Sequence, residues 1–337
     1  MNKKSLIIGF GKRAQKVVFP ALVLSGHEIF IYSRDLNKLR NYKNNFKFEI
    51  IEELNKNNLE QIDKIFICTK NNIYENIIKQ INKINLNKKI TLFVDTPLLY
   101  HFFNIEKFRN NFKNLIVSED EAFDPINVVI KELIKENSSH ELFQINLNFY
   151  GLIAHSISQI SSILNLNNNI EQKIQYGIYL NFKKIKYLLK ISEIKIFFNY
   201  GRDWLSNKSN IEIFLKKKSD TRIIKKYKVE YIFNKNIFDG FKVNNTKYEN
   251  RFVEGIKNKI NFYSINSQHQ SSQKSQIKIL SFFSMLNFYE NNHESNIINY
   301  IKCEYFGSLT KSMKLFINLK FDLIKLRKLL YKLKRRI

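Results

Sequence analysis

The first 35 residues constrain the fold of this chain more than any other stretch. An apolar run at residues 5–8 leads directly into the glycine-rich segment G-F-G-K-R-A at residues 9–14. A helix-compatible segment (residues 15–25) and a second apolar run (residues 27–32) follow. The order strand, glycine turn, helix, strand is typical of the first unit of a dinucleotide-binding fold. The alternative is a glycine turn in another α/β protein, such as a methyltransferase.

Most residues of the glycine turn have a mechanical role in such a fold. Gly9 permits the tight turn, and Gly11 has no side chain to keep a pyrophosphate off the backbone. Ala14 lets the helix pack closely on the strand, and the helix N-terminus offers free N–H groups to an anion. We therefore expect this turn to bind the cofactor through Gly9, Phe10, Gly11, Lys12, Arg13 and Ala14.

The end of the second strand bears on the choice between NAD and NADP. Enzymes that use NAD usually carry an acidic residue there, which binds the ribose diol. This chain has Ser33 and Arg34 instead, a hydroxyl and a guanidinium suited to a 2′-phosphate. We therefore predict NADP as the cofactor. Asp35, one residue further on, keeps NAD as the alternative.

Strands and helices alternate over the first 120 residues. Apolar runs at residues 62–69, 90–94 and 115–117 predict buried strands, and the spacing of isoleucines in residues 73–84 predicts a helix. This alternation is typical of a parallel, doubly wound sheet. Ligands bind such sheets at the carboxyl ends of the strands. Four candidate residues fall there, namely Gly9, Ser33, Thr69 and Asp95.

The pattern changes near Pro125. Alternating segments at residues 142–149, 195–200, 211–216, 227–233, 241–243 and 247–252 indicate a mostly antiparallel sheet. Residues 126–135, 155–164 and 277–289 have helical patterns, and the polar tract at residues 264–275 indicates a surface loop. The expected fold class is therefore α/β, with an N-terminal Rossmann-type parallel sheet and a C-terminal α+β domain. We place the first domain at residues 1–122. The second, at residues 123–337, would bind substrate or mediate oligomerisation.

Composition narrows the class of protein. No run of about 18 uncharged apolar residues occurs in the 337 residues, so no transmembrane segment is expected. Cys68 and Cys303 are too few for a disulfide framework or a metal site, which fits a reducing cytoplasm. The chain has neither an H-E-x-x-H motif nor paired C-x-x-C motifs, and we predict no structural metal.

The formal net charge of +26 has two interpretations. Nucleic-acid binding is one. We prefer the other, a drift toward codons rich in A and T, because the chain is crowded with Lys, Asn and Ile and its basic residues are scattered. The last stretch, with leucines at steps of three and four from Phe316 to Leu333, predicts a basic amphipathic helix. This helix would dock on its own domain, bind a partner or contact a membrane surface.

Taken in order, these segments resemble the Gfo/Idh/MocA family of NAD(P)-dependent oxidoreductases, many of which act on sugars or cyclitols. The glycine turn matches the opening motif of the family, and residues 69–74 (T-K-N-N-I-Y) match its T-P-N-x-x-H motif. Residues 95–97 (D-T-P) correspond to E-K-P, and residues 122–125 (A-F-D-P) to the proline-marked entry to the second domain. Residues 151–158 (G-L-I-A-H-S-I-S) correspond to D-x-x-x-H-x-x-D. The resemblance adds Asn71 and Pro97 to the expected cofactor contacts.

The departures from the family fall on its chemistry. Typical members use the Lys of E-K-P, and an Asp and a His of the later motif, to handle the substrate hydroxyl. The corresponding residues here are Thr96, Gly151 and His155, so only the histidine is retained. His155 has the ordinary pKa of a general acid or base, and capping of the following helix is the equally weighted alternative. Two tyrosines, Tyr74 and Tyr150, are weaker candidate proton donors.

Two functions therefore stay open from the sequence. One is an NADP-dependent oxidoreductase that acts on a small carbonyl, hydroxyl or imine compound, by family habit a sugar or nucleotide sugar. The other is a catalytically silent protein that binds cofactor or sugar and acts as a sensor or assembly partner. We expect a cytoplasmic homo-oligomer in either case. Asp95 is expected to hydrogen-bond near the cofactor, and Cys68 to be a small buried residue rather than a reactive thiol.

Overall fold

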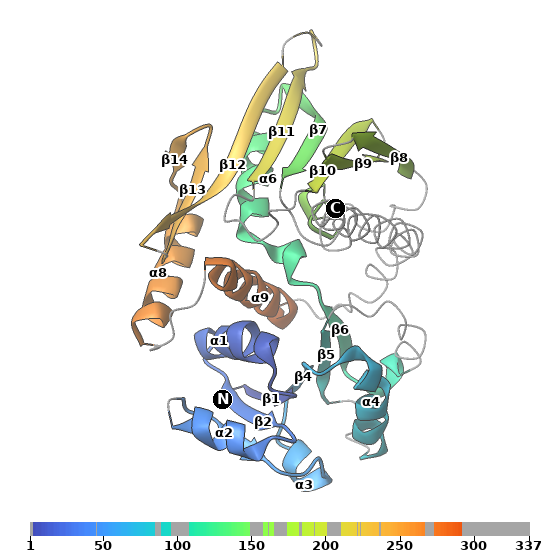
Figure 1. Ribbon diagram of the computed structural model, residues 1–337, viewed down its shortest axis with the longest axis vertical. Coiled ribbons are helices and arrows are strands. Elements are labelled where there is room, and N and C mark those ends of the chain that lie inside the picture. Colours follow the sequence, from blue (N-terminus) through green and yellow to red (C-terminus); the bar gives the residue numbers. More distant parts are fainter. Residues whose placement is uncertain are drawn as a thin grey trace, which may run out of the picture.

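The computed structural model describes residues 3–44, 46–84, 89–95, 108–148, 158–160, 162–164, 174–181, 184–191, 193–200, 210–220, 222, 224–235, 237–266 and 273–291. Two sheets, named sheet A and sheet B, form its two halves. Helix α9 (Gln273–Asn291) lies between them (Figure 1). No described helix has both the length and the apolar character needed to cross a membrane.

Sheet A is a parallel sheet of six strands in the order β3-β2-β1-β4-β5-β6. This order is the one found in dinucleotide-binding folds, and it confirms the sheet expected from the sequence. The strands are short apolar runs, as expected where helices cover both faces of a sheet. Their bounds are Lys4–Ile8 (β1), Glu28–Tyr32 (β2), Glu49–Ile51 (β3), Lys64–Ile67 (β4), Thr91–Asp95 (β5) and Asn114–Ser118 (β6).

The two faces of sheet A have separate hydrophobic cores. One face packs against α3 (Lys56–Leu59) and α4 (Tyr74–Lys83). The other packs against η1 (Ala14–Val18), α1 (Phe19–Leu24), α2 (Leu36–Lys43) and α9. The second core continues through α9 into sheet B, and Phe66 of β4 lies 6.0 Å from Phe282 of α9 between ring centroids. A helix from the end of the described chain thus helps to cover the sheet formed by its beginning.

Sheet B has eight strands in the order β14-β13-β12-β11-β7-β10-β9-β8. Only β7 and β10 pair in parallel, and the other described pairs are antiparallel, which confirms the mostly antiparallel sheet. The strands are His140–Asn148 (β7), Ile174–Asn181 (β8), Lys184–Ile191 (β9), Ile194–Tyr200 (β10), Asn210–Lys217 (β11), Ile224–Asn234 (β12), Ile237–Val243 (β13) and Thr246–Tyr248 (β14).

Helices α6 (Pro125–Glu136) and α8 (Arg251–Asn266) pack against sheet B together with α9. Two local expectations were wrong here. The strand expected at residues 247–252 ends at Tyr248, because the Asn250 side chain accepts a hydrogen bond from the Val253 N–H (2.8 Å) and begins a helix. The surface loop expected at residues 264–275 is helical at both of its ends.

Candidate functional site

The glycine turn after β1 has the backbone that the sequence predicts. Gly9 has a φ of +90°, in the left-handed region that favours glycine. A Cβ atom at this position would lie 2.6 Å from Thr69 Cγ2 and 3.0 Å from the Cys68 carbonyl oxygen. The Gly9 N–H donates to the Tyr32 carbonyl oxygen at 2.8 Å. Gly9 is therefore fixed between the carboxyl ends of β2 and β4, where no larger residue fits.

Gly11 lies in a different environment, because an added Cβ would meet no atom of the described residues within 4 Å. The backbone at Gly11 is exposed, so a ligand can approach it directly. Phe10, between the two glycines, is buried against Tyr42 (4.9 Å between ring centroids) and Phe19 (6.2 Å). This aromatic contact anchors the turn from behind, and buried Ala14 continues it into the helix.

Ser33, Arg34 and Asp35 follow β2 at the same edge of sheet A. Asp35 is the N-cap of α2, since its carboxylate accepts a hydrogen bond from the Lys38 N–H at 3.0 Å. The Ser33 hydroxyl accepts a bond from the Asp35 N–H at 3.4 Å. Arg34 is exposed, and no ion pair of its guanidinium is found within the described ranges. Arg34 is thus available to a ligand, whereas the Asp35 carboxylate is already used by the helix.

A buried ion pair lies on the opposite side of the glycine turn. Arg13 Nε donates to Asp95 Oδ1 at 2.6 Å, and its two terminal nitrogens donate to Asp120 at 3.0 and 3.4 Å. Both carboxylates are buried. Burial alone would lower the pKa of Arg13, but Asp120 and Asp95 raise it well above its ordinary value. The guanidinium is therefore a permanent cation, fixed between β5 and the end of β6.

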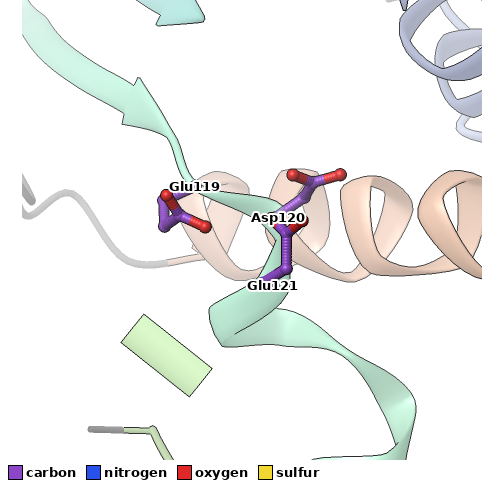
Figure 2. A group of neighbouring side chains, drawn as sticks. All are labelled: Glu119, Asp120 and Glu121. Atoms are coloured by element: carbon purple, nitrogen blue, oxygen red, sulfur yellow. The ribbon is translucent and has the colours of Figure 1, made fainter. Parts of the chain in front are cut away.

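Asp120 belongs to an acidic run that the sequence analysis missed. Glu119, Asp120 and Glu121 stand where the chain leaves β6 and enters η4 (Asp120–Phe123), with α9 behind them (Figure 2). Their position after a parallel strand is a signal that could have found them. Glu121 accepts a hydrogen bond from Lys278 of α9 at 2.7 Å.

The three carboxylates lie within 4.8 Å of one another, close enough to hold a cation. Two protein cations already serve them, because Arg13 binds Asp120 and Lys278 binds Glu121. Burial would lower the pKa of Lys278, but Asp120 and Glu121 raise it above its ordinary value, so its ammonium stays charged. Two of the three carboxylates, Asp120 and Glu121, are thus already paired with cations of the protein.

The remaining candidates at this edge are poor acids or bases. Burial and then Asp95 raise the pKa of the Cys68 thiol well above its ordinary range. The same two causes raise the pKa of Tyr74, which is buried at the start of α4. Thr69 lies against Gly9, and Asn71 begins the turn η2 (Asn71–Ile73).

Asp124 connects the edge to sheet B. Its buried carboxylate caps α6 by accepting from the Ile126 N–H at 3.1 Å, and it accepts from the Tyr231 hydroxyl of β12 at 2.6 Å. Burial raises the pKa of Asp124 to about 7, against the two hydrogen bonds, which lower it. The acidic segment after β6 therefore contacts the glycine turn, α9 and sheet B in turn.

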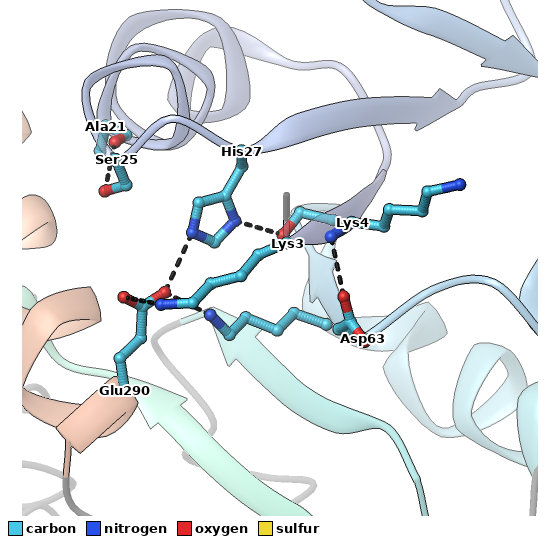
Figure 3. Close-up of polar contacts among 9 residues, drawn as sticks. Lys3, Lys4, Ala21, Ser25, His27, Asp63 and Glu290 are labelled. Atoms are coloured by element: carbon cyan, nitrogen blue, oxygen red, sulfur yellow. Dashed lines mark hydrogen bonds and ion pairs between the residues drawn. The ribbon is translucent and has the colours of Figure 1, made fainter. Parts of the chain in front are cut away.

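The other end of α9 is fixed at the amino edge of sheet A, where its strands begin. Glu290 accepts hydrogen bonds from Lys3 (2.6 Å), from His27 Nε2 (3.0 Å) and from Lys64 (Figure 3). Burial lowers the pKa of His27, so the ring is neutral, and its Nδ1 accepts from the Ser5 hydroxyl at 2.6 Å. Glu290 thus joins Lys3, His27 and Lys64, and Ser5 joins the cluster through His27.

Two of the predicted site residues, Pro97 and His155, lie outside the described residues. The same holds for Thr96, Tyr150 and Gly151. Their roles therefore stay predictions. The described site brings together Gly9 with Thr69 and Arg13 with Asp95, and it leaves Gly11, Lys12 and Arg34 exposed.

A glycine turn of this geometry, at the carboxyl edge of a parallel sheet in this strand order, is typical of dinucleotide-binding folds. The family described as "NADP oxidoreductase coenzyme F420-dependent" matches residues 4–96. No curated protein matches the sequence.

Solved structures show the same two-part architecture. A dehydrogenase (MviM) from Clostridium difficile is 18% identical, with a TM-score of 0.50 over 86% of this chain and 99% of its own. A myo-inositol dehydrogenase from Corynebacterium glutamicum is 10% identical, with a TM-score of 0.52 over 84% and 95%. A super-repressor mutant of Gal80p from Saccharomyces cerevisiae is 13% identical, with a TM-score of 0.52 over 91% and 97%. The chain thus has the two-domain fold of the Gfo/Idh/MocA oxidoreductases.

Proposed function

We propose that the chain binds a nicotinamide dinucleotide, with NADP preferred to NAD, at the carboxyl edge of sheet A. The contrast between the two glycines carries the proposal. Gly9 is required by its backbone and by its neighbours, whereas the backbone at Gly11 faces open space. Open backbone at the start of a helix suits a pyrophosphate, and exposed Lys12 supplies a neighbouring cation.

The preference for NADP rests on the end of β2. Arg34 is exposed beside Ser33, while one oxygen of the Asp35 carboxylate caps α2. A guanidinium binds a phosphate through charge-assisted hydrogen bonds, and an occupied carboxylate offers less to a diol. This arrangement supports the 2′-phosphate of NADP.

We further propose that the protein is an NAD(P)-dependent oxidoreductase for a small carbonyl, hydroxyl or imine compound. The support is the fold, which it shares with dehydrogenases, including one for myo-inositol. A sugar or nucleotide sugar as substrate, a homo-oligomeric state and a cytoplasmic location belong to the same proposal. When bound, the cofactor would supply the hydride chemistry. The protein would hold its phosphates at the glycine turn and neutralise Asp95 with Arg13.

A specific observation favours the silent alternative. Among the described side chains at the carboxyl edge, Cys68 and Tyr74 have raised pKa values, and Asp95 is paired with a permanent cation. None of the three is suited to transfer a proton near neutral pH. One similar structure, moreover, is a super-repressor mutant. In this proposal His155 is the first candidate for the catalytic acid or base.

Titration of the purified protein with NADPH and NADH, followed by nucleotide fluorescence, tests the cofactor. We expect both to bind and NADPH to bind more tightly, and failure of both would overturn the proposal. Oxidation of NADPH in the presence of aldehydes, ketones and imines then separates enzyme from silent binder. In an enzyme, His155→Ala should lower turnover and leave the affinity for NADPH unchanged.

A further inference from the structure

Arg13 does not have the environment of a phosphate ligand, although it lies in the glycine turn. Its guanidinium is directed to Asp95 of β5 and to Asp120 after β6, and both carboxylates are buried. A phosphate placed against this guanidinium would face two buried negative charges at close range. Lys12 differs, because its side chain is exposed and forms no ion pair within the described part of the chain. Lys12 is thus suited to bind a phosphate, whereas Arg13, the next residue, is not.

The strand order assigns Arg13 to one half of the dinucleotide. β2, with Ser33 and Arg34 at its end, lies on one side of β1, and β4, β5 and β6 lie on the other. In folds of this order the ribose that distinguishes NAD from NADP is bound at the end of β2, and the pyrophosphate at the glycine turn. The nicotinamide half therefore extends toward β4 and β5, where the Arg13 guanidinium is fixed.

The guanidinium has hydrogen-bonding capacity to spare. An arginine side chain carries five N–H donors, and Arg13 uses three of them on Asp95 and Asp120. No further bond from its guanidinium is found within the described ranges, and 24% of the side chain is exposed. The Phe282 ring of α9 lies 5.9 Å from Cζ and helps to fix the group in place.

We propose that Arg13 donates its remaining N–H groups to the carbonyl oxygen of the nicotinamide carboxamide. The proposal rests on the proposed function, because it presupposes a bound nicotinamide dinucleotide. A neutral carbonyl oxygen is the acceptor that fits, since Asp95 and Asp120 already balance the positive charge and disfavour an anion. Arg13 then distinguishes the nicotinamide half of the cofactor from the adenosine half.

The test compares two ligands with two variants. NADPH contains both halves, whereas adenosine 2′,5′-bisphosphate contains only the adenosine half. Arg13→Lys keeps a cation between the two carboxylates but removes the planar fork that directs the spare donors. We expect Arg13→Lys to weaken NADPH about tenfold, as for the loss of one or two hydrogen bonds, and to leave the bisphosphate unchanged. Lys12→Met is the matched control and should weaken both ligands.

Thermal unfolding shows whether Arg13→Lys is folded. If it is not, the double variant Arg13→Met/Asp120→Asn replaces it, because this variant removes the cation together with one of its two buried partners. Equal weakening of both ligands would make Arg13 a phosphate ligand and overturn the proposal. Unchanged affinity for both would also overturn it, because the donors would then serve another group, such as a substrate carbonyl. A wild-type protein that binds neither ligand would instead overturn the proposed function itself.

Discussion

Both edges of sheet A are joined to α9 by charged side chains, yet the two edges are built differently. At the amino edge, one acid, Glu290, accepts from Lys3, Lys64 and His27, and the His27 ring accepts from Ser5. At the carboxyl edge, two of the five guanidinium N–H groups of Arg13 have no acceptor among the described residues, and the backbone of Gly11 is exposed.

We infer from this difference that the amino edge contributes to stability and the carboxyl edge to ligand binding. The amino-edge cluster joins α9 to the starts of β1, β2 and β4 through one shared carboxylate, so its contribution goes to holding α9 against the sheet. An edge with unused donors and open backbone is incomplete until a ligand arrives. Substitutions at the amino edge should therefore change unfolding and leave cofactor affinity alone, and selected substitutions at the carboxyl edge should do the opposite.

The largest expected effect is at the amino edge. Glu290→Gln removes the negative charge that serves Lys3, Lys64 and His27 and leaves the two ammonium groups close together. We expect the free energy of unfolding to fall by about 3 kcal/mol, as for other partly buried ion pairs that lose one partner. Urea unfolding measures the change, and NADPH affinity should stay that of the wild type. Glu249→Gln, a 76% exposed acid 3.4 Å from Lys247, is the control and should cost less than about 0.5 kcal/mol.

The effect of Glu290→Gln on stability should depend on pH. Burial would raise the pKa of Glu290, but His27, Lys3 and Lys64 lower it well below its ordinary range. A carboxylate with a lowered pKa stabilises the fold above the ordinary glutamate value of about 4.3 and loses this effect as the pH falls further. The difference in stability between wild type and Glu290→Gln should therefore shrink below about pH 4. A constant difference from pH 7 down to pH 3 would show that packing, and not charge, is responsible.

Substitution of the two glycines of the turn should have different effects, one on stability and the other on cofactor affinity. Gly9→Ala forces a side chain into a left-handed backbone and against Thr69, and we expect a loss of about 2 kcal/mol in stability. Gly11→Ala meets no neighbour, so stability should hold while the new methyl group weakens NADPH at least tenfold.

Gly255→Ala is the matched control for the second variant, because a Cβ there also meets no atom within 4 Å. It lies in α8, away from the turn, and should leave NADPH affinity unchanged. If Gly11→Ala binds NADPH as tightly as Gly255→Ala does, the open backbone at Gly11 is not a phosphate site.

Asp124 should show a pH dependence opposite to that of Glu290. Its pKa is raised to about 7 by burial, so the folded protein binds a proton between about pH 4 and pH 7 that the unfolded chain has released. The free energy of unfolding should therefore fall as the pH rises from 4 to 7, by roughly 2 kcal/mol after allowance for relaxation of the buried site. Asp124→Asn keeps an acceptor for Ile126 and Tyr231 and should flatten the profile. Urea unfolding at pH 5, 6 and 8 makes the comparison, and identical slopes for both proteins would contradict it.

Local patterns in the sequence were enough to predict sheet A. Each of its strands is a short apolar run between polar residues, and the glycine turn marks where the first strand meets its helix. The exposed state of Arg34 and the constraint on Gly9 also follow from motif position. The long-range contacts cannot be predicted from motif position. Nothing near residues 273–291 indicates that α9 packs against β4 and η1, more than 200 residues earlier, because that packing depends on the complementary shapes of two surfaces.

The candidate site shows the same limit. Arg13 was placed with the phosphate ligands because of its neighbours in the sequence. Its partners Asp95 and Asp120 come from strands far along the chain. Local pattern cannot show that two carboxylates converge on one guanidinium. Asp120, at the carboxyl end of β6, is the one member that sequence position could have identified. The hairpin of β8 and β9 was missed because its residues follow a polar, asparagine-rich tract.

The smallest expected effect is on NADPH affinity, through contact of its 2′-phosphate with the end of β2. Arg34→Ala removes an exposed guanidinium, so the fold should be unaffected, and we expect about a tenfold loss of NADPH affinity. NADH, which lacks the 2′-phosphate, should bind to the variant as it binds to the wild type. Fluorescence titration with both nucleotides gives the ratio of affinities, which is independent of small differences in protein activity between preparations.

Arg40→Ala tests whether position or only charge matters. Arg40 lies on α2, is 63% exposed and is 3.7 Å from Glu52, so it offers the same charge a short distance away. Loss of the NADPH preference in Arg34→Ala but not in Arg40→Ala would locate the 2′-phosphate at the end of β2. An equal change in both variants would mean that the nucleotide responds to the general positive field of this basic chain, whose screening by salt could then be measured directly. In that case the carboxyl edge would select a dinucleotide through Gly11, Lys12 and Arg13.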